Sequence, residues 1–199
     1  RQHRGVHLNS SSRSAELYSA GGSQKVPWLR SFDFADIYLA EALFILSANF
    51  EPADIKDLTA FDFDECDITS FAGLSNLKYI SGDLKIDEPH NFELDNFYGL
   101  TSLNYIGGSL KLSEWSLEST SGLDNLNNVN KIEIYECNSL TTIIGFEQID
   151  TLLEGLYIDD NFALSNLNGF SSLQYIGSDL EIRDNAQLQS LSALINLKT

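Results

Sequence analysis

The chain has 199 residues, of which 29 are acidic and 12 are basic, so its formal net charge is −17 at pH 7. Apolar residues make up 43% of the chain, which indicates a protein that folds around a core. The acidic excess argues against a nucleic-acid partner, because such a partner needs an electropositive face. No apolar run reaches the roughly 18 residues of a membrane span, and two cysteines are too few for a disulfide-dense scaffold.

The first thirty residues differ from the rest in charge and composition. Residues 1–30 hold five basic residues and one acidic residue, a net charge of +4, whereas residues 31–199 carry a net charge of −21. The segment is rich in Ser, Gly and Arg and lacks apolar periodicity, which predicts a basic tail over residues 1–30 or a remnant outside the fold. Opposite charges make this tail and the acidic body electrostatically suited to meet.

Residues 31–54 are dense in apolar side chains and end near a Glu-Pro dipeptide. Ser31 or Asp33 is a suitable helix N-cap, so the segment predicts a short buried helix over residues 33–48. A helix lying on a membrane surface would need a basic polar face, whereas the polar positions here are acidic. We expect residues 31–54 to cap the N-terminal end of a repeat array.

From about residue 55 onward the sequence repeats every 22–26 residues. The recurring unit is a pair of apolar residues separated by one position, followed later by a Gly-Leu or Gly-Phe pair. The apolar pairs are Phe61/Phe63, Leu84/Ile86, Leu110/Leu112, Ile132/Ile134, Leu156/Ile158 and Leu180/Ile182. A fixed period of this length is typical of a solenoid, so residues 55–199 predict a mainly β fold of about six turns with stacked parallel strands.

Two residue types follow these strand pairs at a fixed spacing of three positions. Asn161 and Asn185 are expected to hydrogen-bond the turn backbone. Cys66 and Cys137 occupy the same column on the first and fourth turns, which places them roughly 14 Å apart. A disulfide needs Cα atoms within about 7 Å. We therefore expect two buried thiols that are not joined to each other.

A pattern recurs in which Tyr-Ile is followed by a small turn and then by Leu-x-Ile or Leu-x-Leu. It occurs in segments 71–86, 105–112 and 170–182. In these segments the chain resembles the receptor L-domain family, which includes the ligand-binding lobes of insulin and epidermal growth factor receptors. The resemblance implies a right-handed parallel β-helix over residues 55–199, a location outside the cell or on its surface, and a role in binding or adhesion. It brings no catalytic residues. The disulfides usual in the receptor lobes are not expected here.

The outward positions of the predicted sheet hold the candidate binding residues. Aromatic side chains beside acids are typical of a contact with a protein or a glycan, and the alternative is ordinary packing on a solvated sheet face. The candidates are Tyr135, Tyr157, Trp115, Glu133, Asp159 and Arg183.

Catalytic and metal-binding patterns are largely missing from the sequence. It holds no nucleophile elbow, phosphate loop or HExxH helix, so no enzyme activity and no cofactor are predicted. The run Asp159-Asp160-Asn161 is only partly repeated one turn later, where Arg183 replaces the first acid. We predict no specific metal site, and weak, diffuse calcium binding to the acidic surface stays open.

The C-terminal end begins a new turn and has no expected cap, so we expect an open edge there. Either the sequence is a truncated piece of a longer protein, or another chain covers this edge. The first interpretation is an extracytoplasmic binding or adhesion module that recognises a protein or glycan. The alternative is a structural subunit whose partners are other copies of itself, joined head to tail. The residues proposed for such assembly are Arg1, Arg4, Arg13, Lys25, Leu194 and Leu197.

Overall fold

The computed structural model describes residues 4–9, 14–19, 22–25, 58–62, 71, 74–75, 77–87, 95–114 and 116–198. Side chains are described from residue 71 onward. The predicted helix over residues 33–48, Cys66 and Trp115 lie outside the described residues. Within them, the short 3-10 turns are η3 (Asn168–Phe170) and η4 (Ser192–Leu194), and Leu74 is also in a 3-10 conformation. No helix of the described residues is long and apolar enough to cross a membrane.

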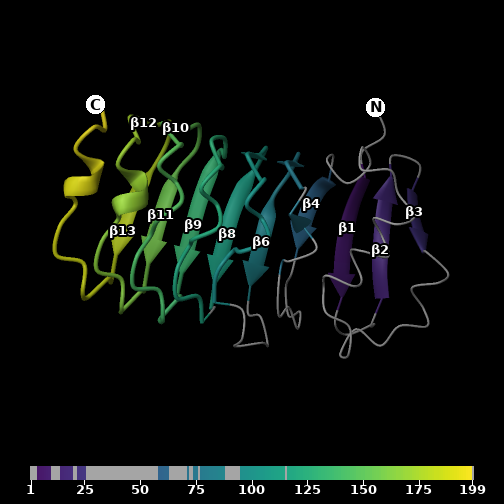
Figure 1. Cartoon of the computed structure of the whole chain (residues 1–199), viewed down its shortest axis with the longest axis horizontal. Helices are drawn as coiled ribbons and strands as arrows, with labels where there is room; N and C mark the ends of the chain where they lie inside the picture. The colour runs from purple at the N-terminus through teal and green to yellow at the C-terminus, as the bar shows by residue number, and fades with distance from the viewer. Residues whose placement is uncertain are drawn as a thin grey trace.

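One long sheet runs the length of the molecule (Figure 1). Its strand order is β13-β11-β9-β8-β6-β4-β1-β2-β3. The strands, in that order, are Leu180–Arg183, Leu156–Asp159, Lys131–Tyr135, Ser109–Ser113, Leu84–Asp87, Leu58–Asp62, Arg4–Asn9, Ser14–Ser19 and Gly22–Lys25. The shorter strands precede the corners of the turns. They are β5 (Tyr79–Ile80), β7 (Tyr105–Ile106), β10 (Thr151–Leu152) and β12 (Tyr175–Ile176).

The strands from β4 to β13 are parallel and in phase with the repeat. Leu110 pairs with Leu84 on one side and Ile132 on the other, and Leu156 pairs with Ile132 and Leu180. This register confirms the mainly β solenoid with parallel strands. The five strands from β6 to β13 enclose about four turns, slightly fewer than the six that the sequence predicts.

The core consists of the inward side chains of these strands and of the turns between them. Each central strand alternates between buried and half-exposed residues, as in Leu156 and Ile158, which are fully buried, and Tyr157, which is half-exposed. Phenylalanines add ladders between turns, with ring centroids 5.7 Å apart for Phe71 and Phe97. Each turn therefore buries its apolar side chains against the turns before and after it.

Gly122 belongs to the Gly-Leu and Gly-Phe pairs that recur in the repeat. Its φ is +103°, a conformation that strongly favours glycine. A Cβ at this position would also lie 2.4 Å from the backbone carbon of Phe97 in the preceding turn. Glycine is therefore required here both by backbone conformation and by the close approach of the neighbouring turn.

The predicted hydrogen bonds of Asn161 and Asn185 to the turn backbone are also confirmed, and we call these two stacked residues the asparagine ladder. The Asn161 side chain is fully buried, accepts a hydrogen bond from the Cys137 N–H at 3.0 Å, and donates to the Ile134 carbonyl at 3.0 Å. Asn185 repeats the pattern one turn later, accepting from the Asn161 N–H at 3.2 Å. Cys137 is buried, and its thiol lies 3.5 Å from the Tyr135 carbonyl oxygen. These side chains tie successive turns together where the strands end.

The N-terminal segment is placed differently from the predicted tail. β1 pairs in parallel with β4, and β2 and β3 follow as antiparallel neighbours, so three strands extend the main sheet (Figure 1). Backbone hydrogen bonds join these strands, and their short apolar alternation is in register, with Val6 opposite Leu17 and Leu8 opposite Ala15. Strand β3 thus forms the edge opposite β13.

Candidate functional site

Five of the six predicted binding residues meet on the outward face of three neighbouring strands, β9, β11 and β13. Tyr157 lies between Glu133 and Glu181, and Asp159 lies between Tyr135 and Arg183. We call this surface, together with its flanking residues, the charged sheet face. It comprises Lys131, Glu133, Tyr135, Tyr157, Asp159, Asp179, Glu181 and Arg183.

Lys131 organises the centre of the charged sheet face, although the sequence analysis did not single it out. Its Nζ lies 2.9 Å from Glu133 Oε1 and 5.2 Å from the centre of the Tyr157 ring. The hydrogen bond to Glu133 raises the Lys131 pKa, against the effect of burial, so the ammonium stays charged. A cation over a tyrosine ring is attracted by the negative face of the ring.

The two tyrosines are held as neutral phenols. Burial and the neighbouring Glu133 raise the pKa of Tyr135 to about 12, and its hydroxyl donates to Glu133 Oε1 at 3.4 Å. The Tyr157 hydroxyl donates to Asp179 Oδ2 at 3.0 Å, and this hydrogen bond raises the Tyr157 pKa. Both phenols therefore remain protonated near neutral pH and act as hydrogen-bond donors to carboxylates.

Arg183 lies on β13, at the C-terminal side of the charged sheet face. Its guanidinium lies 2.9 Å from Asp159 Oδ2 and 2.8 Å from Glu181 Oε1, and its side chain is 58% exposed. Burial acts to lower the Arg183 pKa, but Asp159 and Glu181 outweigh it and raise that pKa. One exposed cation thus bridges carboxylates on β11 and β13.

Carboxylates are also paired with cations on the earlier strands β6 and β8, where two lysines contact Asp87. Lys85 Nζ and Lys111 Nζ lie 3.3 and 2.9 Å from Asp87 Oδ2, and the Ser113 hydroxyl donates to Asp87 Oδ1. Burial acts to raise the Asp87 pKa, but the hydrogen bonds from Lys111 and Ser113 outweigh it and lower that pKa. Carboxylates of the outward sheet surface are thus paired with cations over several turns.

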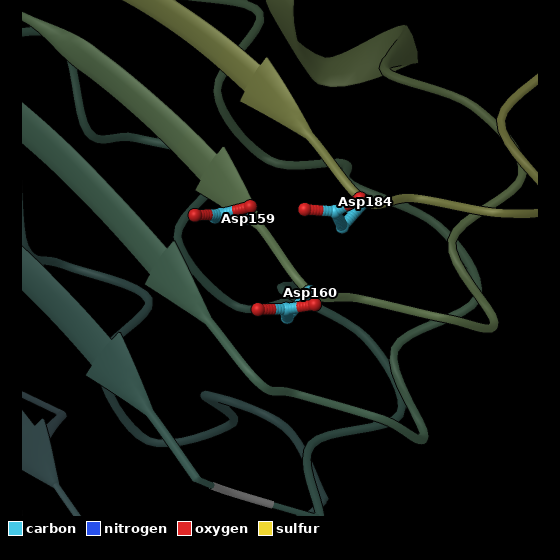
Figure 2. Close-up of side chains that lie close together, drawn as sticks. All are labelled: Asp159, Asp160 and Asp184. Atoms are coloured by element: carbon cyan, nitrogen blue, oxygen red, sulfur yellow. The ribbon is translucent and has the colours of Figure 1, made fainter.

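Three carboxylates converge at the C-terminal ends of β11 and β13 (Figure 2). One oxygen each from Asp159, Asp160 and Asp184 lies within 4.8 Å of the others. Oxygen ligands of this kind suit Ca²⁺ or Mg²⁺. However, Asp159 Oδ2 is already paired with Arg183, while its Oδ1 is buried without a hydrogen-bond partner. The sequence suggested only diffuse acidity here because Arg183 replaces the first acid in the following turn.

Sequence reasoning missed a second acidic feature, a column of left-handed residues directly after the strands. Glu114, Glu136, Asp160 and Asp184 have φ values of +51°, +52°, +56° and +48°. The available signal was an acid two positions after the second apolar residue of each strand pair. The left-handed step turns the chain so that the next residue, such as Cys137 or Asn161, is buried.

The described residues among those proposed for self-assembly lie toward opposite ends of the molecule. Arg4 and Lys25 lie in β1 and β3, whereas Arg1 and Arg13 lie outside the described residues. Leu194 is 9% exposed and belongs to the core, and Leu197 packs partly against it. The exposed apolar side chains at the C-terminal end are instead Leu180, Leu191 and Ile195.

The fold and the in-register polar face define a solenoid of the leucine-rich repeat type. The family profile described as "Endo-beta-N-acetylglucosaminidase EndoS LRR domain" matches residues 98–198, about half of the chain. The chain therefore belongs to this leucine-rich repeat family, whereas the match does not single out the receptor L-domain. Comparisons with curated proteins and with solved structures gave no match. Solenoids of this type generally mediate protein binding.

Proposed function

We propose that this chain is a protein-binding module without catalytic activity of its own, and that the charged sheet face is its contact surface. The observation that carries the proposal is a set of contacts that joins three strands: Lys131 of β9 lies over the Tyr157 ring of β11, and Arg183 of β13 pairs with Asp159 of β11. Lys131, Glu133 and Arg183 are held by neighbours at 2.8–2.9 Å, so their positions are set before a partner arrives. Such preorganisation lowers the entropy cost of binding.

The chemistry of the face favours a protein partner over a glycan. A sugar ring stacks on an open aromatic face, but the Tyr157 ring already has Lys131 Nζ above it, 5.2 Å from its centre. Cations and carboxylates lie side by side along β9, as Lys131 and Glu133, and along β13, as Arg183 and Glu181, which fits a partner surface of mixed charge. The family resemblance in sequence supports an adhesive role outside the cell, and this location is part of the proposal.

Site-specific photo-crosslinking tests the contact surface. A photoreactive phenylalanine replaces Tyr157, and a matched protein carries it at Tyr98, which is 64% exposed and lies outside the main-sheet strands. Incubation with secreted and surface proteins of the source cells should give a discrete crosslinked species only for position 157. The species should disappear when Lys131→Glu is added. Equal crosslinking from both positions would contradict the proposal, and specific retention on a glycan array would favour the glycan alternative.

Head-to-tail assembly is the second candidate function, supported by the unpaired outer edge of β13 among the described strands. It is the weaker candidate, because β1 already pairs with β4 of the same chain instead of lying free for a neighbour. Light scattering after size exclusion, at low and high salt, tests it. A monomer mass near 22.2 kDa in both conditions would reject assembly, and large salt-sensitive species would support it.

A further inference from the structure

Tyrosines recur on a second outward surface of the solenoid, which is built from the short strands β5, β7, β10 and β12. Tyr79 of β5 pairs in register with Tyr105 of β7, and Asn128 lies beside Tyr105 on the next turn. Thr151 of β10 then pairs with Tyr175 of β12. We call these five residues the tyrosine column. The column crosses successive turns and therefore runs along the axis of the solenoid.

The tyrosine column is open to solvent although its turns have neighbours. Tyr79 is 44% exposed, Asn128 is exposed, and Tyr105 is half-exposed. Strand β5 pairs with both β4 and β7, so the exposure of Tyr79 does not come from an end of the array. The ring centroids of Tyr79 and Tyr105 lie 5.4 Å apart, with an interplanar angle of 35°. A contiguous exposed aromatic surface of this kind is typical of a binding site.

The stack of tyrosines is interrupted between Tyr105 and Tyr175. Asn128 and Thr151 occupy the two positions between them, and both have short side chains. Three strand spacings of ~4.8 Å place the two tyrosine Cα atoms roughly 14 Å apart. On the side away from Tyr79, the next residue beside Tyr105 in the column is therefore a short polar residue and not another aromatic ring.

The polar groups at this interruption are unused. Among the described residues, the Asn128 amide, the Thr151 hydroxyl and the Tyr105 hydroxyl have no hydrogen-bond partner. On the charged sheet face, by contrast, the hydroxyls of Tyr135 and Tyr157 donate to carboxylates at 3.4 and 3.0 Å. The tyrosine column thus combines aromatic surface with hydrogen-bonding groups that are available to a ligand.

The surroundings of the column carry no net charge, although the net charge of the chain is −17. In the residues directly before the members of the column, the charged side chains are one cation, Lys78, and one acid, Asp150. The outward residues two positions after the members of the column are all uncharged. They are Ser81, Gly107, Asn130, Leu153 and Gly177. This surface therefore suits a neutral ligand, whereas an acidic ligand would be repelled by the protein as a whole.

We propose that the tyrosine column binds a neutral linear oligosaccharide, with one sugar ring packed against Tyr105 beside Asn128 and Thr151. A sugar ring presents C–H groups on its faces and hydroxyls around its rim. The C–H groups match the aromatic side of the interruption, and the hydroxyls match its free amide and hydroxyl groups. This match favours a sugar over a protein segment. The site is separate from the charged sheet face and does not depend on the function proposed for that face.

Binding of labelled hexasaccharides to the full chain tests the proposal. The neutral probes are cellohexaose, laminarihexaose, chitohexaose and mannohexaose, and the acidic control is hexagalacturonate. Fluorescence anisotropy should show saturable binding of at least one neutral probe and much weaker binding of the acidic control. Absence of binding by all neutral probes would overturn the proposal, as would a preference for hexagalacturonate.

Three protein variants locate the site of binding. Asn128→Tyr fills the interruption with another ring and should abolish binding of the neutral probe, while Tyr105→Ala should weaken it about tenfold. Tyr98→Ala is the control and should bind normally, because Tyr98 is 64% exposed and lies outside the column. Unchanged binding by Asn128→Tyr would overturn the proposal. So would loss of binding in Tyr157→Ala with normal binding in Tyr105→Ala, because the sugar would then lie on the charged sheet face.

Crosslinking separates a sugar from a protein occupant. A photoreactive phenylalanine at position 105 is exposed to the secreted and surface proteins of the source cells, with and without the neutral probe. A discrete protein crosslink that the probe does not displace would overturn the proposal, because the occupant would then be a protein. Failure of sugar binding here leaves the crosslinking test at Tyr157 unaffected, so the two proposals fail independently.

Discussion

The turn that begins at β11 and the turn that begins at β13 carry nearly the same sequence pattern in different surroundings. Leu156, Asn161 and Leu167 in the first are at most 1% exposed. Their equivalents in the second are half-buried or exposed, and Leu191 reaches 52%. The first turn lies between two neighbours and the second has only one. The apolar residues of a turn are therefore buried by the turns on both sides of it, and the stability of a turn depends on these neighbours as well as on its own sequence.

Matched leucine substitutions should show the largest difference between the two turns. Leu156→Ala leaves a cavity in the closed core and should lower the free energy of unfolding by about 2–5 kcal/mol. Leu180→Ala removes a side chain that is 42% exposed, so the loss should be about 1 kcal/mol or less. Urea unfolding of both variants measures the two losses. Equal losses would mean that the edge of β13 is covered in solution.

The asparagines give a second matched pair with a smaller effect. Asn161→Ala removes the buried hydrogen bonds from its side chain to the Cys137 N–H and the Ile134 carbonyl, which should cost about 3 kcal/mol. Asn185→Ala uncovers the Asn161 N–H and the Ile158 carbonyl beside solvent, so about 1 kcal/mol is expected. Denaturant unfolding gives both values. A larger loss at Asn185 would contradict the dependence on neighbouring turns.

Sequence reasoning succeeded where the repeat determines the position of a residue. The spacing of the apolar pairs correctly predicted the register of the parallel strands and the role of Asn161, because a fixed period stacks equivalent positions. It failed for β1, β2 and β3, because the alternation of apolar residues there, such as Val6 and Leu8, is short and stands among Ser, Gly and Arg. It predicted no cluster of Asp159, Asp160 and Asp184, because Arg183 stands at the position equivalent to Asp159 and the acidic run is therefore only partly repeated.

The residues with left-handed backbone conformation give a third matched pair. We expect the free-energy cost of this conformation to be the same in both turns, because it depends on the backbone of the residue itself. Asp160 and Asp184 have φ values of +56° and +48°, a conformation that costs a residue other than glycine roughly 1 kcal/mol. Asp160→Gly and Asp184→Gly should each change stability by between 0 and about +1 kcal/mol, because glycine also favours the unfolded chain. Asn at either position removes the charge and keeps a side chain, which separates repulsion from strain. A gain confined to one turn would show that the strain is not local.

The smallest expected effect is a change of stability with pH that depends on Tyr135. This residue lies on β9, which has a neighbouring strand on both sides. Burial beside Glu133 raises the Tyr135 pKa from 10.0 to about 12, so the folded state binds this proton more tightly than the unfolded state. The resulting stabilisation is complete below pH 10 and is lost as the pH rises through 12. The difference in absorbance at 295 nm between the wild type and Tyr135→Phe should titrate near pH 12. A difference titrating near 10 would mean that Tyr135 is solvated, and that the network on the charged sheet face does not hold its hydroxyl against Glu133.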